Sequence, residues 1–132
     1  MIHVVAGLIV RGREILACQR PAGGDHPLKW EFPGGKCEAG ETLAMGLRRE
    51  LQEELAIDAE IGRELWRTRH QYPGREALEL RLFLVAAYRG ALVNRAFAQI
   101  RWVPLGALST FDFLEADRKF IERLDHGELT ID

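Results

Sequence analysis

Residues 31–57, EFPGGKCEAGETLAMGLRRELQEELAI, decide how the rest of the sequence is interpreted. Pro33, Gly34 and Gly35 predict a turn, because proline presets one backbone angle and glycine permits conformations that other residues avoid. Residues 42–55 are rich in Leu, Ala, Glu, Arg and Gln, which are good helix formers. The sequence therefore predicts a glycine-rich loop that leads directly into a helix.

Three glutamates crowd one side of this predicted helix. On a helical wheel, Glu50, Glu53 and Glu54 fall within about 100° of one another, at the border of the apolar stripe. Like charges at these spacings repel, and Arg49 offsets only part of the cost. A hard divalent cation would compensate the rest, since Mg²⁺ and Mn²⁺ prefer oxygen ligands. The ordinary alternative is a solvated acidic face, but the adjoining glycine loop, where backbone approaches closely, favours a site.

Length and composition narrow the class of protein. The chain has 132 residues, which predicts a single domain over residues 1–132. Hydrophobic residues make up 47% and charged residues 29%, a globular mix that suffices for one core. The net charge of −2 argues against a protein that coats nucleic acid through a basic surface. We therefore expect a small-molecule partner and no nucleic acid polymer.

The cysteines and the first residues bear on location. Cys18 lies in an apolar run and Cys37 in the glycine-rich loop, and two reduced thiols are typical of a cytoplasmic protein. The first apolar run has no basic leader before it and, at about nine residues, is too short to span a bilayer as a helix. We expect a cytoplasmic monomer or homodimer with no membrane partner.

Strands are predicted on both sides of the helix. Residues 4–10 and 14–18 predict a hairpin around Gly12. Further predictions are a loop over residues 21–28, strands over 30–32, 57–70, 77–88 and 99–103, a turn over 72–75, and a closing helix over 114–124. Strands, helix, strands and helix in this order predict an α+β fold, with a mixed β-sheet covered by helices.

The stretch quoted above resembles the Nudix box, G-x5-E-x7-R-E-U-x-E-E-x-G-U, where U is a bulky apolar residue. The matching positions are Gly35, Glu41, Arg49, Glu50, Leu51, Glu53, Glu54 and Ile57. Ala56 departs from the pattern, because it stands where the pattern has glycine. If the helix ends there in a left-handed turn, alanine costs roughly 1 kcal/mol relative to glycine.

The segments KWEFPGGK (29–36) and FDFLEADRKFIERL (111–124) resemble the MutT-like branch of the Nudix family. The resemblance implies an α/β/α sandwich and a Mg²⁺-dependent attack of water on a nucleoside triphosphate. Mn²⁺ is the alternative cation. The products would be a nucleoside monophosphate and pyrophosphate, and 8-oxo-dGTP would be the first-choice substrate. The alternatives are a pyrophosphohydrolase of CTP or 5-modified pyrimidine triphosphates, and a catalytically weak module that senses a nucleotide.

The same resemblance implies the roles of the residues in the box. Bound metal ions stabilise charge on phosphoryl oxygens and aim a water molecule. The implied metal ligands are the Gly34 carbonyl, Glu50, Glu53 and Glu54, of which Glu50 or Glu53 would also activate the water. Arg49 would position these glutamates for catalysis. Gly35 and Glu41 would have structural roles, with Glu41 as a brace of the loop.

Outside the box, the resemblance marks candidates for substrate binding. Arg20 would contact phosphates, with an ordinary surface arginine as the alternative. Phe32, Phe111 and Phe113 offer stacking area for a base, with core packing as the alternative for each. Asp117 stands where relatives carry Asn or Asp to read the base edge. It offers a donor only when protonated, which requires a dry pocket, and a helix-start aspartate is the alternative.

One further position departs from the relatives. Ala96 lies near the place, before the last predicted strand, where relatives often carry a glutamate that helps the metal or the water. No other acidic residue lies between Gly90 and Val103. We therefore expect either that the helix carboxylates act alone or that turnover is slow.

Overall fold

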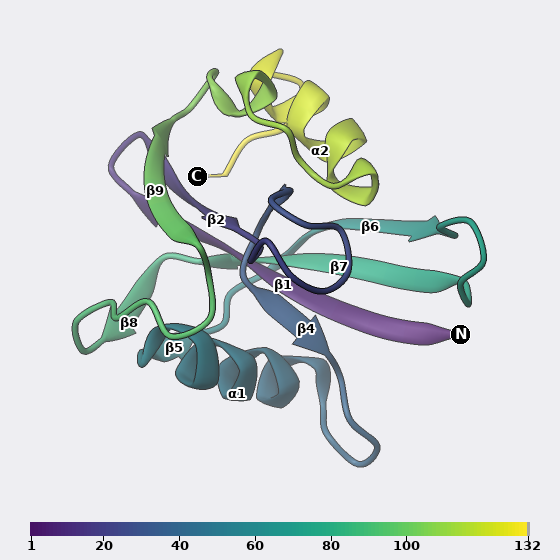
Figure 1. The fold of residues 1–132 in the computed structure, drawn as a ribbon. Helices are drawn as coiled ribbons and strands as arrows, with labels where there is room; N and C mark the ends of the chain where they lie inside the picture. The colour runs from purple at the N-terminus through teal and green to yellow at the C-terminus, as the bar shows by residue number, and fades with distance from the viewer. Residues whose placement is uncertain (132) are drawn as a thin grey trace.

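The computed structural model describes residues 1–131. Within them, a seven-stranded mixed sheet and a separate two-stranded sheet are accompanied by two α-helices and a short 3₁₀ helix (Figure 1). The elements are β1 (Ile2–Arg11), β2 (Glu14–Gln19), β3 (Trp30–Glu31), β4 (Gly34–Lys36), α1 (Leu43–Leu55), β5 (Asp58–Glu60), β6 (Glu64–His70), β7 (Leu78–Val85), β8 (Ala87–Arg89), β9 (Gln99–Pro104), η1 (Leu108–Thr110) and α2 (Glu115–Asp125).

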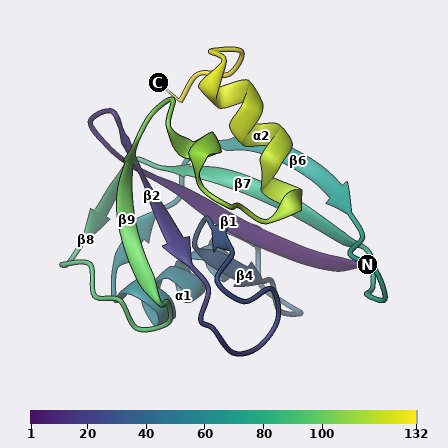
Figure 2. The ribbon, with the colours of Figure 1, turned by 45° about the horizontal axis from the view of Figure 1, so that its top comes forward.

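The main sheet is built around β1 (Figure 2). β1 pairs in parallel with β7 and antiparallel with β2 and β4. β6 extends the sheet beyond β7, and β3 and β9 both pair with β2. The hairpin predicted around Gly12 is confirmed, since Val10 lies opposite Ile15.

The two α-helices cover opposite faces of this sheet. In Figure 1, α2 lies above the sheet and α1 below it. Because side chains alternate along a strand, Ala6 and Leu8 of β1 join the core cluster on the α2 side, whereas Val5 and Ile9 join the cluster on the α1 side. The α/β/α sandwich with a mixed sheet is thus confirmed. Neither α-helix of residues 1–131 is long and apolar enough to cross a membrane.

The single strands predicted over residues 57–70 and 77–88 are wrong. Each is divided, and the separated parts, β5 and β8, pair with each other away from the main sheet. The break coincides with a close crossing, where the Gly62 N–H donates to the Leu84 carbonyl at 2.7 Å. A Cβ at Gly62 would lie 2.9 Å from that oxygen, so a side chain there would collide. The sequence-based prediction also missed β4, because its two glycines are poor strand formers.

Local chemistry fixes both ends of α1. At the start, the Thr42 hydroxyl accepts a hydrogen bond from the Met45 N–H at 3.1 Å. At the end, Ala56 has φ 61° and ψ 28°, and its N–H donates to the Gln52 carbonyl at 3.0 Å. The left-handed turn that the Nudix pattern assigns to glycine is therefore present, and alanine occupies it.

We predict that Ala56→Gly stabilises the protein by about 1 kcal/mol, because glycine removes the steric cost of the left-handed conformation. The free energy of unfolding, measured by urea titration, tests this expectation. Ala44→Gly is the matched control, since Ala44 is exposed within the same helix with ordinary helical geometry. The control should lose up to about 1 kcal/mol. Equal losses in both variants would show that the turn at Ala56 carries no strain.

Candidate active site

One cavity of about 320 Å³ collects most of the residues that the sequence marks as a site. It runs from α1 and β4 to the start of α2, and its walls include Arg20, Phe32, Gly34, Gly35, Glu54 and Asp117. Glu41, Arg49, Glu50 and Glu53 do not line it and lie beside it on α1 and the preceding loop. A larger hollow of about 590 Å³ lies between α1 and the β5–β8 pair. None of the predicted site residues lines that hollow.

The diglycine of the loop lets its backbone pass between β1 and α1. A Cβ on Gly34 would lie 2.0 Å from the Val5 carbonyl oxygen, and a Cβ on Gly35 would lie 2.6 Å from the Glu50 carboxylate. At Gly34 a side chain would collide with backbone, and at Gly35 it would displace the Glu50 carboxylate. The close passage allows the Gly34 N–H to donate to Glu54 Oε1 at 3.0 Å. The loop backbone and the helix carboxylates therefore form one compact unit.

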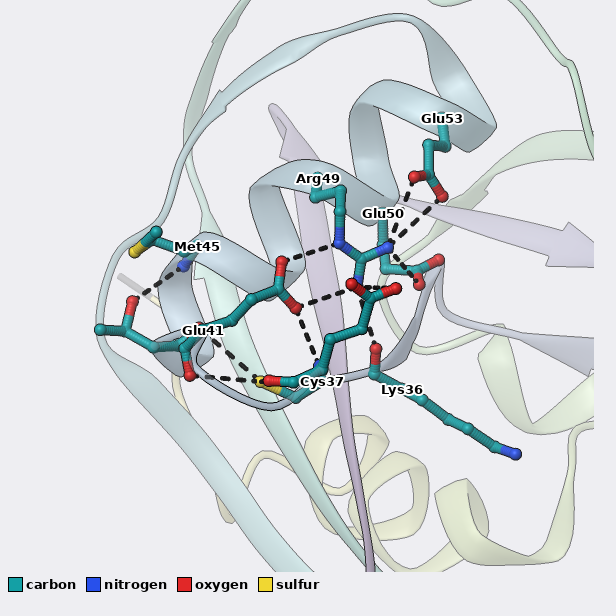
Figure 3. A network of polar contacts seen from close by, with 9 residues as sticks. Lys36, Cys37, Glu41, Met45, Arg49, Glu50 and Glu53 are labelled. Atoms are coloured by element: carbon teal, nitrogen blue, oxygen red, sulfur yellow. Dashed lines mark hydrogen bonds and ion pairs between the residues drawn. The ribbon is translucent and has the colours of Figure 1, made fainter.

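Arg49 holds this unit together (Figure 3). Its guanidinium donates through Nε and Nη2 to both carboxylate oxygens of Glu41, at 2.8 and 3.1 Å. Nη1 donates to Glu50 Oε1 at 3.0 Å, and Nη2 also donates to the Lys36 carbonyl at 3.1 Å. Glu53, whose side chain is 59% exposed, accepts a longer hydrogen bond from Nη1 at 3.4 Å. One planar fork thus joins the loop to the helix.

The carboxylates of α1 lack sufficient compensating charge. Burial, together with the charges of the nearby carboxylates Glu31 and Glu50, raises the pKa of Glu54 to about 8. Burial also raises the pKa of Glu50, although the bond to Arg49 opposes this. Both shifts have the sign expected of an acidic site that needs a cation.

The donor set fits a hard divalent cation, because Glu50, Glu53, Glu54 and the nearby backbone carbonyls offer only oxygen. In the described conformation, Glu50 bonds to Arg49 and Glu54 bonds to the Gly34 N–H. Over residues 1–131, no three His, Cys, Asp or Glu side chains are already arranged to hold a metal ion. Each of these bonds uses only Oε1, so a metal would be held by the second carboxylate oxygen of Glu50 and of Glu54.

Asp117 lies at the other end of the cavity, in the first turn of α2. It is 4% exposed, and its carboxyl group has no hydrogen-bond partner within residues 1–131. Burial raises its pKa well above the ordinary value, and Glu31 adds to the shift. A protonated carboxyl presents one donor and one acceptor. The structure thus supplies a largely buried position at the cavity wall, as reading of a base edge by Asp117 requires.

The three phenylalanines have different positions. Phe32 lines the cavity, although it is only 2% exposed and its ring contacts those of Phe113 and Phe120. Phe113 is buried in the core, and Phe111 packs its edge against Trp30 with ring centres 4.9 Å apart. Neither Phe111 nor Phe113 lines this cavity.

Arg20 lies inside the cavity and is not an isolated surface residue. Its Nη1 donates to the two carboxylate oxygens of Glu31 at 3.1 and 3.3 Å, and its Nε donates to the Asp25 carbonyl at 2.9 Å. Sequence reasoning missed Glu31. A signal was present, because a carboxylate alternates with Trp30 and Phe32 in an extended segment and so points away from two aromatic neighbours.

A second missed feature is an ion pair in the cavity wall. Arg75 forms a bidentate ion pair with Asp25, at 2.6 and 2.9 Å, which ties the turn after β6 to the loop after β2. The His26 and Tyr72 rings pack against each other beside it, with centres 4.4 Å apart. Arg75 follows Asp25 by fifty residues, so no local pattern announces the pair.

Comparison with known proteins identifies the family to which this site belongs. Residues 1–124 match the family described as the NUDIX domain. The chain belongs to the Nudix family. It is 38% identical over 127 residues to the 8-oxo-dGTP diphosphatase of Haemophilus influenzae, covering 94% of this chain and 91% of the relative. It is 34% identical over 122 residues to the CTP pyrophosphohydrolase of Escherichia coli, covering 92% and 90%.

Solved structures agree. The solution structure of the E. coli ORF135 protein superposes on this Nudix protein with a TM-score of 0.83 and 34% identity, covering 92% of this chain and 86% of that chain. A MutT structure from a study of Aliivibrio salmonicida and Vibrio cholerae gives a TM-score of 0.74 at 33% identity, covering 96% and 98%. The resemblance to MutT-like Nudix hydrolases is confirmed, and the protein is a hydrolase of this family.

We predict that Arg49→Lys lowers the turnover of this Nudix hydrolase by about ten- to a hundredfold, as is typical when a group that orients metal ligands is lost. Lysine keeps the charge but cannot bond Glu41 and Glu50 together, since it lacks the planar fork. Steady-state kinetics with a nucleoside triphosphate would measure the loss. Arg48→Lys is the control, because Arg48 lies on the exposed side of α1 and bonds only Asp58 within residues 1–131. An unchanged rate in Arg49→Lys would contradict the positioning role.

We predict that Asp117→Asn stabilises the protein at neutral pH. The folded-state pKa of Asp117 lies above its ordinary value of 3.8. Its contribution to stability is therefore fully present below about pH 3.8 and is lost as the pH rises through the folded-state pKa. Asparagine does not titrate, so the difference in unfolding free energy should be near zero at pH 4 and grow in favour of the variant by pH 8. Urea titrations at these pH values test the sign. A difference independent of pH would mean that Asp117 is not held protonated.

Proposed function

We propose that this Nudix hydrolase is a nucleoside triphosphate pyrophosphohydrolase that uses Mg²⁺, or Mn²⁺ in its place. Its products are a nucleoside monophosphate and pyrophosphate, and its role is to clear unwanted nucleotides from the pool, with 8-oxo-dGTP as first-choice substrate. One observation carries the proposal. A single cavity is lined by Glu54 from the carboxylate-rich helix α1, by Arg20, and by the buried Asp117 carboxyl of α2. The α1 and α2 sides of the cavity match the triphosphate and the base of one nucleotide.

At the carboxylate end, the Gly34 carbonyl, Glu50, Glu53 and Glu54 would hold the metal. Bound there, the metal supplies charge neutralisation for phosphoryl oxygens and a water of lowered pKa. Glu50 or Glu53 would take the proton from the attacking water, because both lie on the same stripe of α1. Arg49 holds Glu50 in place, and Arg20 has guanidinium donors that suit a phosphate oxygen.

At the other end, the protonated Asp117 carboxyl can donate and accept on one edge of a base. 8-Oxoguanine offers the O6 acceptor beside the N7–H donor, whereas cytosine offers the N3 acceptor beside the N4 amino donor. Both bases therefore fit. The similarity to both an 8-oxo-dGTP diphosphatase and a CTP pyrophosphohydrolase supports the same pair. CTP, or a 5-modified pyrimidine triphosphate, is the second candidate substrate.

A nucleotide sensor without turnover is the alternative function. Ala96, which stands near the place of a glutamate in relatives, is exposed in the loop before β9. The backbone of this loop packs on the end of α1, since the Arg95 N–H donates to the Glu54 carbonyl at 2.9 Å. The retained carboxylates of α1 favour the enzyme over the sensor. The proposal includes a single domain over residues 1–132 that acts in the cytoplasm as a monomer or homodimer.

A turnover panel tests the function. With Mg²⁺ present, we expect one of 8-oxo-dGTP, dGTP, CTP and 5-methyl-dCTP to yield monophosphate and pyrophosphate, and ADP-ribose and a dinucleoside tetraphosphate to stay intact. The double variant Glu53→Gln, Glu54→Gln should lose about 10³-fold, as expected when several kcal/mol of metal-based stabilisation is removed. Removal of the metal with a chelator should have the same effect.

Two other results would change the conclusion. If no triphosphate is turned over while one still raises the melting temperature, the protein is the sensor and not the enzyme. If the double variant retains full activity, the carboxylates of α1 are not the metal site.

A further inference from the structure

Glu31 lines the cavity, and its neighbours in the fold lead to both the proposed metal end and the proposed base end. It lies on β3, three residues before Gly34, whose N–H bonds Glu54 at 3.0 Å. On its other side, the Leu114 N–H donates to the Trp30 carbonyl at 2.9 Å, so β3 also adjoins the segment that enters α2. Since three extended residues span at most about 10 Å, Glu31 lies within the length of one nucleotide from both ends.

The electrostatics agree with this position. The charge of Glu31 is close enough to raise the pKa values of both Glu54 and Asp117. Its own side chain is 19% exposed and lines the cavity. It is therefore the carboxylate that both ends of the cavity have in common, and neither the metal site nor the base site proposed above requires it.

Burial of a carboxylate is costly, and Arg20 compensates only part of it. Burial raises the pKa of Glu31, while the charge and the hydrogen bonds of Arg20 oppose the shift. Arg20 Nη1 is shared between the two oxygens at 3.1 and 3.3 Å. No other hydrogen bond to the Glu31 carboxylate occurs within residues 1–131. Each carboxylate oxygen has two lone pairs, so Glu31 retains acceptor capacity that faces the cavity.

The pentose lies between the triphosphate and the base of a nucleotide. Its hydroxyl groups are donors, and a carboxylate is the strongest acceptor that a side chain offers them. The 3′-hydroxyl is present in ribose and in deoxyribose, so its recognition is compatible with either candidate substrate. A site with a buried acceptor also discriminates against a substrate analogue that lacks the hydroxyl donor, because the acceptor is then left without a partner.

We propose that Glu31 is a specificity-determining residue that accepts a hydrogen bond from the 3′-hydroxyl of the substrate's pentose. The inference rests on the proposed function, since it presumes a nucleotide in the cavity. It narrows the substrates to nucleotides with a free 3′-hydroxyl. The carboxylate of Glu31 then has two partners, the guanidinium of Arg20 and the sugar.

Kinetics with paired analogues tests the proposal. We expect the wild-type protein to prefer dCTP over 2′,3′-dideoxy-CTP, and dGTP over 2′,3′-dideoxy-GTP, by about tenfold or more in kcat/KM, as for a hydrogen bond to a charged acceptor. Glu31→Met keeps the length of the side chain and removes the acceptor, so its ratio should fall to about twofold or less. Glu31→Gln retains a neutral acceptor, and its ratio should lie between these two.

Glu76→Gln is the matched control, because Glu76 lines the same cavity and pairs with the terminal amine of Met1. Its ratio should equal that of the wild type. Melting temperatures of all variants show whether each one is folded. If Glu31 only neutralises Arg20, the variants will slow dCTP and dideoxy-CTP equally, and the proposal is overturned. A wild-type ratio of one, or variants that shift only the Mg²⁺ concentration needed for activity, would also overturn it.

Binding measurements separate this inference from the proposed function. Calorimetry in a chelating buffer compares dCMP with 2′,3′-dideoxy-CMP, and dGMP with 2′,3′-dideoxy-GMP, and requires neither metal nor turnover. If no triphosphate is cleaved but the wild type binds a deoxynucleotide at least tenfold tighter than its dideoxy analogue and Glu31→Met does not, the hydrolase proposal fails and the role of Glu31 stands. If triphosphates are cleaved but the paired ratios remain at one, the reverse holds.

Discussion

The hydrogen bond between the Gly34 N–H and the Glu54 carboxylate is the contact on which the arrangement of the site depends. It forms where the backbone of Gly34 passes too close to the Val5 carbonyl oxygen for any Cβ. The same passage makes β4 a partner of β1 and so fixes the loop to the centre of the sheet. Arg49 then joins the far side of the loop to α1 through Glu41 and Lys36. The loop is therefore held to the sheet through β1 and to α1 through Arg49.

Charge balance is the second property of the cavity. Four carboxyl groups with raised pKa values, those of Glu31, Glu50, Glu54 and Asp117, belong to it or border it. Arg20 and Arg49 are already bonded to Glu31, Glu41 and Glu50. A site with this excess of acid favours a divalent cation at one end and protonation at the other, because Asp117 is buried and its carboxyl group has no hydrogen-bond partner within residues 1–131. One cavity thereby presents two different chemistries.

Local signals predicted the elements that depend on local interactions. The hairpin around Gly12 and the two α-helices appear where the turn residue and the helix formers indicated them. The prediction was wrong where a contact distant in sequence decides the outcome. Apolar and polar residues alternate over residues 57–70, although imperfectly, and this pattern predicted one strand. The strand breaks at Gly62 because the chain crosses the Leu84 carbonyl there. β4 exists because β1 lies beside it, not because its glycines prefer a strand.

The sequence by itself determined the carboxylate stripe, since helix geometry places residues three and four apart on one side whatever surrounds them. It also determined the glycine loop at Gly34 and Gly35. The helix end at Ala56 follows from the sequence too, because the number of residues between it and the glutamates is fixed along the chain. The tertiary structure decided which carboxyl groups are buried, and hence the raised pKa of Asp117, because burial is produced by residues from several elements. It alone brought Glu31, Glu54 and Asp117 to one cavity, and paired Asp25 with Arg75 across fifty residues of chain.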